Sequence, residues 1–191
     1  MDNEEAKTLL NLVAMGDQIA FSALYRGQSR MIFAFVFNQL NSVAESEEVV
    51  SETMFDVWKG AAKFRGESSV RTWILGIARN KMLMKFRARV VAHDDIDDYG
   101  ESIASDEPDV VALIAETQRA QGVQRCMAKL TLEHRECLHL LFFEGSSVAE
   151  ISGVQNVPIG TVKTRLHHAR LKIKSCLANL LRDEGGALEG V

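Results

Sequence analysis

The chain has 191 residues, of which 47% are hydrophobic and 25% charged, with a net charge of −4. This mixture is typical of a soluble globular protein and excludes a disordered chain, and the longest apolar run, Met31–Phe37, is far too short to cross a bilayer. The opening MDNEEAK is acidic where a secretory signal would be basic, so we expect a cytoplasmic protein. The cysteines are odd in number and widely spaced, at Cys126, Cys137 and Cys176. This pattern predicts reduced thiols in small cores and no disulfide framework.

The charges fall into blocks along the chain. Residues 59–89 carry nine basic side chains and one acidic, and residues 118–182 carry ten basic and four acidic. Between them, residues 90–117 carry nine acidic side chains and no basic one. Because phosphate contacts depend on local charge, two basic blocks are compatible with nucleic-acid binding even on an acidic chain.

Helical periodicity dominates the first half and predicts three helices of an all-α protein. The first begins near Asp17, a favourable N-cap, and the second follows Ser42, which forms a capping-box pattern with Glu45. The third covers residues 70–89, after the break RGESS. The expected core positions of the first two helices are Ala20, Phe21, Leu24, Ile32, Phe35, Val36, Val49, Val50, Thr53, Met54, Val57 and Trp58.

An acidic segment separates two small helical domains, residues 1–90 and 118–182. Residues 91–117 contain no Lys or Arg and are punctuated by Gly, Ser and Pro, which predicts a flexible linker. The second domain restarts with an apolar stripe of Val123, Met127 and Leu130, and then LEHRECLHLLFF after a cap at Thr131. Four helices are expected in it, and residues 183–191 are expected to form a disordered tail.

The segment SVAEISGVQNVPIGTVKTRLHHARLKIK has the pattern of a helix-turn-helix. Ser147 and Glu150 form a capping box that starts a short helix, and Pro158 suits the first position of the next one. On a helical wheel that second helix has a core face around Val162, with Leu166, Ala169, Ile173, Cys176 and Leu177. Its polar side chains lie in the first turns, where a recognition helix enters the major groove.

A solvated cationic face on an ordinary helical hairpin is the competing interpretation of this segment. Bare helix-turn-helix patterns are weak, and most charge runs are solvated. However, no acidic residue follows in this helix until Asp183, and Leu171 projects away from the core stripe. An all-cationic helix favours DNA binding because it repels itself in the absence of a polyanion.

The second half resembles the fourth-region domain of bacterial sigma factors of the extracytoplasmic-function type, on LTLEHRECLHLLFFEGSSVAEISGVQNVPIGTVKTRLHHARLKIKSCL. The first half resembles the second-region domain of the same family, on MGDQIAFSALYRGQSRMI, AESEEVVSETMFDVWKG and KFRGESSVRTWILGIARNKMLMKFRAR. Together these motifs cover most of the chain in the right order. The resemblance implies that the first domain binds core RNA polymerase and the −10 element, and that the second binds the −35 element of promoter DNA.

The resemblance and the wheel assign three sets of residues. The −35 set is Thr161, Lys163, Thr164, Arg165, His167, His168 and Arg170. The −10 set, in which Phe64 and Asn80 are implied contacts to a flipped base, is Lys63, Phe64, Arg65, Ser68, Arg71, Asn80, Lys81, Lys85 and Arg87. The polymerase set, an acidic face suited to a cationic partner, is Glu47, Glu48, Val50, Ser51, Glu52, Phe55 and Asp56.

Other readings of single features are less favourable. Trp58 and Trp73 are expected in the core and not as base-stacking platforms. The acidic linker is compatible both with a solvated spacer and with the polymerase-cleft segment of the family. His134, Cys137 and His139 fan across a helix without a fourth ligand, so we expect no metal site and no cofactor.

We expect no enzyme and no small-molecule substrate, because the sequence contains no P-loop, nucleophile elbow, HExxH or dinucleotide motif. The family is commonly restrained by an anti-sigma factor, which is therefore an expected partner, and direct membrane insertion is not expected. The alternative is a free-standing helix-turn-helix activator or repressor. A third interpretation, two domains that merely clamp a partner, leaves both basic blocks unexplained.

Overall fold

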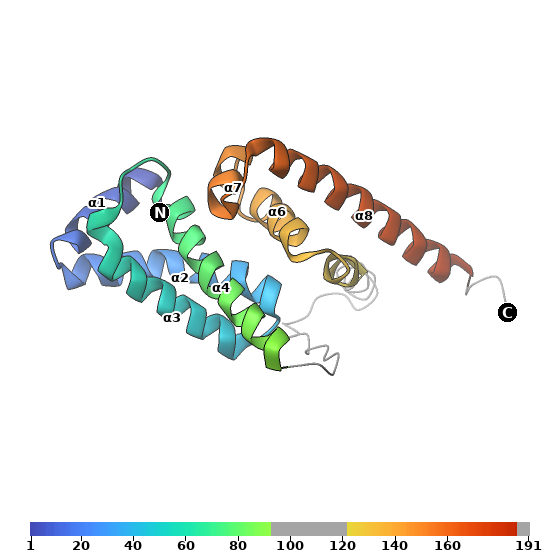
Figure 1. Cartoon of the computed structure of the whole chain (residues 1–191), viewed down its shortest axis with the longest axis horizontal. Coiled ribbons are helices and arrows are strands. Elements are labelled where there is room, and N and C mark those ends of the chain that lie inside the picture. The colour runs from blue at the N-terminus through green and yellow to red at the C-terminus, as the bar shows by residue number, and fades with distance from the viewer. Residues whose placement is uncertain (93–121, 187–191) are drawn as a thin grey trace, which may run out of the picture.

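The computed structural model describes residues 1–92 and 122–186, with the side chains of residues 1–88 and 122–180. Within these ranges every regular element is a helix, which confirms the all-α prediction (Figure 1). The expected linker lies outside the described residues from residue 93 onward. Its first two residues belong to the end of α4, and α8 continues to Gly186, so the expected tail begins as helix at residues 183–186.

The first domain contains α1 (Asn3–Ala14), α2 (Gln18–Leu40), α3 (Val43–Gly60), the short 3-10 helix η1 (Ala61–Lys63) and α4 (Val70–Ala92). Asp17 caps α2 by accepting the Ile19 and Ala20 N–H groups, as predicted. The helix α1 was not among the expected elements. It packs on α2, α3, η1 and α4 and adds Ala6, Leu10 and Val13 to the core.

The expected core of α2 and α3 is confirmed. Ten of its twelve positions are buried, and Phe21 and Trp58 pack half-buried against them with ring centroids 5.1 Å apart. The largest buried side chains here are Phe35, Leu24 and Ile32. This apolar layer holds α3 and α4 side by side, so that the acidic face of one lies beside the basic face of the other.

The second domain contains a helix over residues 122–128, α6 (Leu132–Phe142), α7 (Val148–Gln155) and α8 (Ile159–Gly186). Leu130 is buried and Met127 half-buried, but Val123 is exposed because Cys126, not Val123, faces the core. On α8 the buried residues are Val162, Leu166 and Ala169, whereas Leu171 is exposed, both as the wheel predicts.

The helix-turn-helix geometry is present in α7 and α8. Ser147 and Glu150 form the predicted capping box, in which each side chain bonds the backbone N–H of the other. The turn begins at Asn156, which has a positive φ of 52°. Pro158 was predicted as the first residue of α8, but it is the residue immediately before that helix. Its carbonyl accepts the Thr161 and Val162 N–H groups.

The two domains pack against each other. The helix α7 lies on α4, and α6 lies on α2, as Figure 1 shows with the orange elements beside the green and blue ones. One continuous apolar core runs through both domains. A side chain added at Gly153 of α7 would meet the Thr72 methyl of α4 at 3.3 Å, so the backbones approach closely.

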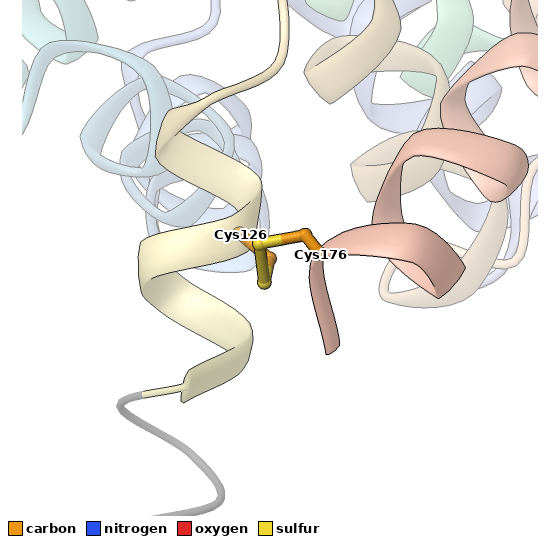
Figure 2. The surroundings of a disulfide bond; sticks show 2 residues. All are labelled: Cys126 and Cys176. Atoms are coloured by element: carbon orange, nitrogen blue, oxygen red, sulfur yellow. A yellow bond between two sulfur atoms is a disulfide. The ribbon is translucent and has the colours of Figure 1, made fainter. Parts of the chain in front are cut away.

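The prediction of three reduced thiols is wrong. Cys126 and Cys176 form a disulfide with a Cα–Cα distance of 5.8 Å, which joins the helix over residues 122–128 to α8 (Figure 2). Only the tertiary packing brings together two cysteines that lie 50 residues apart in sequence. Cys137 is free and buried, and burial raises the pKa of its thiol to about 11, as expected for an inert structural thiol.

Candidate nucleic-acid and polymerase interfaces

The −35 set lies on the exposed side of α8, opposite the core stripe. Five of its members are exposed, and Thr161 and Arg165 are half-buried. The Arg170 guanidinium lies 5.7 Å from the ring centroid of Phe142. The exposed members, which α8 presents in its first three turns, are Lys163, Thr164, His167, His168 and Arg170.

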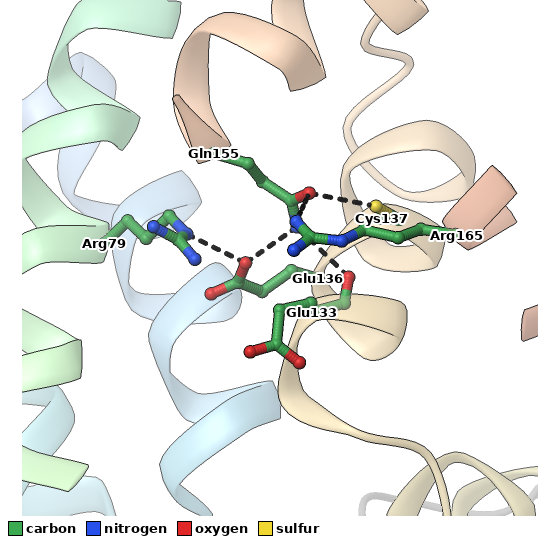
Figure 3. Close-up of polar contacts among 6 residues, drawn as sticks. All are labelled: Arg79, Glu133, Glu136, Cys137, Gln155 and Arg165. Carbon is green, nitrogen blue, oxygen red and sulfur yellow. Dashed lines mark hydrogen bonds and ion pairs between the residues drawn. The ribbon is translucent and has the colours of Figure 1, made fainter. Parts of the chain in front are cut away.

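Arg165 is held in place by a side chain of α7. Its Nη1 donates to Gln155 Oε1 at 2.8 Å, and the Cys137 thiol donates to the same oxygen at 3.3 Å (Figure 3). The Gln155 amide nitrogen donates to the Glu133 carbonyl oxygen at 3.1 Å and to Glu136 Oε2 at 2.8 Å. Arg165 is therefore the one member of the −35 set that this cluster restrains.

Glu136 is the centre of this cluster and has an entirely buried side chain. The Arg79 Nε donates to its Oε2 at 2.8 Å, so that the pair joins α4 of the first domain to α6 of the second (Figure 3). Burial raises the pKa of Glu136, although the charge and hydrogen bond of Arg79 and the Gln155 amide oppose the rise. The Oε1 atom of Glu136 has no hydrogen-bond partner.

A second interdomain cluster lies near the start of α4. Arg71 forms an ion pair with Glu144, which follows α6, and His139 Nε2 lies 3.4 Å from Glu144 Oε1. The His139 Nδ1 is hydrogen-bonded to the Asn38 amide of α2 at 2.8 Å. Burial disfavours the ionised form of Glu144, yet the neighbouring His139 and the charge of Arg71 outweigh it and lower the pKa of Glu144.

The predicted melting loop, Lys63 to Ser69, projects between η1 and α4. Lys63 and Arg65 are exposed, and Gly66 has a φ of +74°, which favours glycine there. Phe64 is half-buried against Trp73, with ring centroids 5.3 Å apart. Trp73 was expected in the core, and it is half-buried and packs against the core from its edge.

The loop is tied to α1 at its end. The Val70 N–H, the first of α4, donates to Asn3 Oδ1 of α1 at 3.0 Å. Ser69 accepts the Thr72 N–H at 3.1 Å and thus caps the same helix.

The remaining members of the −10 set lie along α4. Asn80 and Arg87 are exposed. Lys81 lies 2.9 Å from Asp56 of α3, and this hydrogen bond raises the pKa of Lys81 against the effect of desolvation. Lys85 is ion-paired with Glu48, also of α3. Two cations of the −10 set, Lys81 and Lys85, are therefore paired with carboxylates of the polymerase set across the α3–α4 contact.

The polymerase set occupies one face of α3, with one exception. Glu47, Glu48, Ser51 and Phe55 are exposed, and the Lys59 ammonium lies 4.0 Å over the Phe55 ring. Glu52 and Asp56 are half-buried beside Lys81. Val50 is buried with 5% of its surface exposed, because the same helix must bury its apolar stripe, so it does not belong to this face.

Within residues 1–92 and 122–186 no helix is long and apolar enough to span a membrane. In the same residues no group of His, Cys, Asp and Glu side chains is arranged to hold a metal ion. The ring centroid of His168 lies 5.6 Å from that of His167 and 6.5 Å from that of His134, with His167 and His168 exposed on α8 and His134 half-buried on α6.

Sequence reasoning missed the residues that join the domains. Arg79, Glu136, Glu144 and Gln155 were not in any predicted set. One signal was present for Glu136: it follows Leu132 and precedes Leu140 by four positions, which places a carboxylate on the core face of α6. A buried carboxylate requires a partner, although the sequence does not say which one.

Comparisons with known proteins bear on both domains. Residues 24–90 match the family model for sigma-70 region 2, and residues 120–173 match the model for sigma-70 region 4. The extracytoplasmic-function RNA polymerase sigma factor SigK of Mycobacterium bovis BCG is 28% identical over 178 residues, covering 92% of this chain and 95% of that protein. The SigK of Mycobacterium ulcerans is 27% identical with the same coverage.

Two solved structures share the fold. The sigma factor RpoE of Bartonella quintana, crystallised with the anti-sigma factor NepR, has a TM-score of 0.67 and 21% identity, covering 83% of this chain and 96% of that one. CnrH, in complex with the cytosolic domain of CnrY, has a TM-score of 0.65 and 22% identity, covering 92% and 98%. With both regions matched in order, the chain belongs to the sigma-70 family and is a sigma factor of the extracytoplasmic-function type.

Proposed function

We propose that this sigma factor binds core RNA polymerase through α3, contacts the −35 element through α8, and opens the −10 element with α4 and the loop before it. The observation that carries the proposal is the arrangement of α8. Its hydroxyl, imidazole and cationic side chains are exposed in the first turns, directly opposite a buried core stripe. That is the geometry a helix-turn-helix needs to enter the major groove.

The −35 contacts divide by chemistry. Lys163 and Arg170 suit phosphates, which strengthen binding without reading sequence. Thr164, His167 and His168 carry donors and acceptors suited to base edges. Arg165 contributes after it leaves Gln155.

Strand opening at −10 uses binding energy in place of a chemical step. Single-stranded DNA is held by aromatic stacking and by cations that follow its backbone. Phe64 supplies a ring that packs on Trp73 of α4, the helix that also carries the exposed Asn80. The charge comes from Arg65, Arg71, Lys81, Lys85 and Arg87. We therefore assign no catalysis to this chain, and place it in the cytoplasm with the polymerase.

Polymerase contact uses the exposed acidic and aromatic side chains of α3. Glu47, Glu48, Ser51 and Phe55 form the exposed part of this face. Glu48 becomes available when Lys85 turns to DNA, and Glu52 and Asp56 become available when Lys81 does. An acidic face with one exposed ring suits a basic partner surface. Val50 has no place in it.

An anti-sigma factor is the proposed restraining partner. The two solved structures above are complexes with NepR and with the cytosolic domain of CnrY, and both sigma factors have this fold. The exposed face of α3 is the surface whose coverage would block polymerase binding.

The proposal is tested by DNA binding with and without polymerase. We expect the isolated protein to bind promoter duplex weakly, and its mixture with core polymerase to bind one promoter specifically. Phe55→Ala should reduce the assembly with polymerase, whereas the matched control Phe142→Ala removes a ring of similar exposure from the second domain and should leave the assembly unchanged. Tight operator binding by the isolated protein, with no effect of polymerase, would indicate a free-standing regulator and overturn the proposal.

A further inference from the structure

We propose that α6 also contacts DNA at the −35 site, where His134 of α6 and Lys172 of α8 bind the phosphate backbone beside the recognition helix, and His134 takes up a proton as it binds. This inference rests on the proposed function of α8. It adds a contact outside the three assigned sets and a pH dependence of DNA binding. The ligand is the DNA backbone, whose phosphates are bound through charge and not through sequence.

His134 of α6 lies beside one flank of α8. Its ring centroid is 6.5 Å from that of His168, a member of the −35 set. On a wheel of about 100° per residue, the exposed Lys172 falls between His168 and Arg165, so these three side chains share one side of α8. The charges of all three act on the His134 ring. We call these four residues the α6–α8 flank.

The α6–α8 flank is cationic and continues the −35 set toward α6. Arg165 and Lys172 are permanent cations, and Lys172 is exposed. Among the described groups that act on His134, the carboxylate of Glu133 on α6 alone opposes them. Cations gathered on one flank repel each other, and a polyanion relieves this repulsion. A DNA phosphate beside the recognition helix is therefore the ligand that this flank suits.

The protonation of His134 depends on what lies beside it. Burial, followed by the charge of Lys172, lowers the pKa of His134 below its ordinary value, and His168 and Arg165 act in the same direction against Glu133. The ring is therefore largely neutral at about pH 7 in the free protein. An approaching phosphate favours the protonated ring instead, because opposite charges attract.

One nitrogen of the His134 ring lacks a partner. Its Nδ1 is buried and makes no hydrogen bond to the described residues. A buried polar atom without a partner is unfavourable, so Nδ1 does not tie the ring to this orientation. A protonated imidazole carries two N–H donors, and phosphate oxygens are strong acceptors. Turning the ring toward a phosphate therefore supplies the partner that Nδ1 lacks.

DNA binding and protonation of His134 therefore strengthen each other. The pKa of the ring is higher in the complex than in the free protein, so the complex takes up a proton as it forms. The gain in affinity is complete at a pH below the pKa of the free ring, and it is lost as the pH rises through the pKa of the bound ring. DNA binding must tighten as the pH falls.

Two variants of His134 in the full-length protein test the inference by pH. His134→Gln keeps a polar side chain that cannot take up a proton, and His134→Arg carries a permanent charge. The readout is fluorescence anisotropy of a labelled DNA duplex of mixed sequence, about 20 base pairs long, at about 50 mM salt and between about pH 5.5 and 8. A mixed sequence suffices because phosphate contacts carry no sequence information.

We expect wild-type binding to strengthen about fivefold more than that of His134→Gln as the pH falls across this range, the size of one charge-assisted contact at a screened surface. His134→Arg should bind more tightly than wild type at the upper end of the range. Its remaining pH dependence should equal that of His134→Gln, because His167 and His168 titrate in all three proteins.

A comparison of two lysines tests the other half of the contact by charge. Lys172→Ala should lower the slope of log affinity against log salt by about one, as for the loss of one phosphate contact. Lys174→Ala is the matched control, because Lys174 is exposed on the same helix but lies on the opposite flank. It should change the slope less. This comparison decides the inference if His134→Gln proves unstable in a thermal melt.

The outcomes separate the inference from the proposed function. Equal pH dependence in wild type and His134→Gln, equal slopes for the two lysine variants, or no duplex binding by wild type would overturn the inference. A loss of the same size at every pH in both His134 variants would do so too, because the ring would then only fill space between α6 and α8. The predicted pH and salt effects support the inference even if core polymerase leaves promoter binding unchanged, a result that would instead overturn the proposed function.

Discussion

The two basic helices, α4 and α8, present their charges in opposite ways. On α8 most of the −35 set faces solvent, whereas on α4 Arg71, Lys81 and Lys85 are each ion-paired with a carboxylate. A free cation binds phosphate at the cost of its hydration alone, but a paired one must also leave its partner. Similar basic content in two helices therefore does not mean similar readiness to bind DNA.

The largest expected effect comes from a charged substitution on the buried face of α8. Val162→Asp places an unpaired carboxylate at a position that is 0% exposed, which costs more than about 4 kcal/mol. We expect the second domain to unfold while the first keeps its helices. Thermal melting monitored by circular dichroism measures the loss of helix. Thr164→Asp introduces the same charge at an exposed position and should change stability by less than about 0.5 kcal/mol. Equal loss in both variants would contradict the assigned core face.

A smaller effect concerns the anchoring of α8. The disulfide between Cys126 and Cys176 closes a loop of 50 residues, for which the chain-entropy account gives about 4 kcal/mol of stabilisation. Reduction with dithiothreitol should lower the melting temperature of the second domain. Cys176→Ser should melt at the reduced value and show no response to the reductant. An identical melt for the oxidised and reduced wild type would show that packing alone anchors α8.

The smallest effect compares single cations of the two helices. Lys163→Ala should weaken promoter binding by the polymerase complex and lower the salt slope by about one, as for the loss of one phosphate contact. Lys81→Ala should weaken binding less, because binding through Lys81 first requires breaking its pair with Asp56. Filter binding over a range of salt concentrations measures both. A larger loss for Lys81→Ala would contradict the argument that paired cations contribute less.

The sequence predicts local structure well where one segment carries its own signals. The caps at Asp17 and Ser147, the stripe of α3 and the core arc of α8 depend only on neighbouring residues, and the structure confirms them. The helix α1 carried the same kind of signal, an Asp2 cap followed by Ala6, Leu10 and Val13, and was overlooked.

The remaining features depend on partners that are remote in the sequence. Arg79 and Glu136 lie 57 positions apart, Arg71 and Glu144 lie 73 apart, and the disulfide spans 50. No periodicity or spacing specifies such pairs, since they follow from how two domains pack. Val50 shows the same limit within one helix, because its place in the stripe excludes the surface role that the family resemblance implied.

Run-off transcription with purified core polymerase tests the central claim most directly. On a template with one promoter, we expect a single product of defined length that requires both this protein and core polymerase, and a weaker product with Lys163→Ala. No product with any promoter template, together with specific binding of the isolated protein to duplex DNA, would contradict the account.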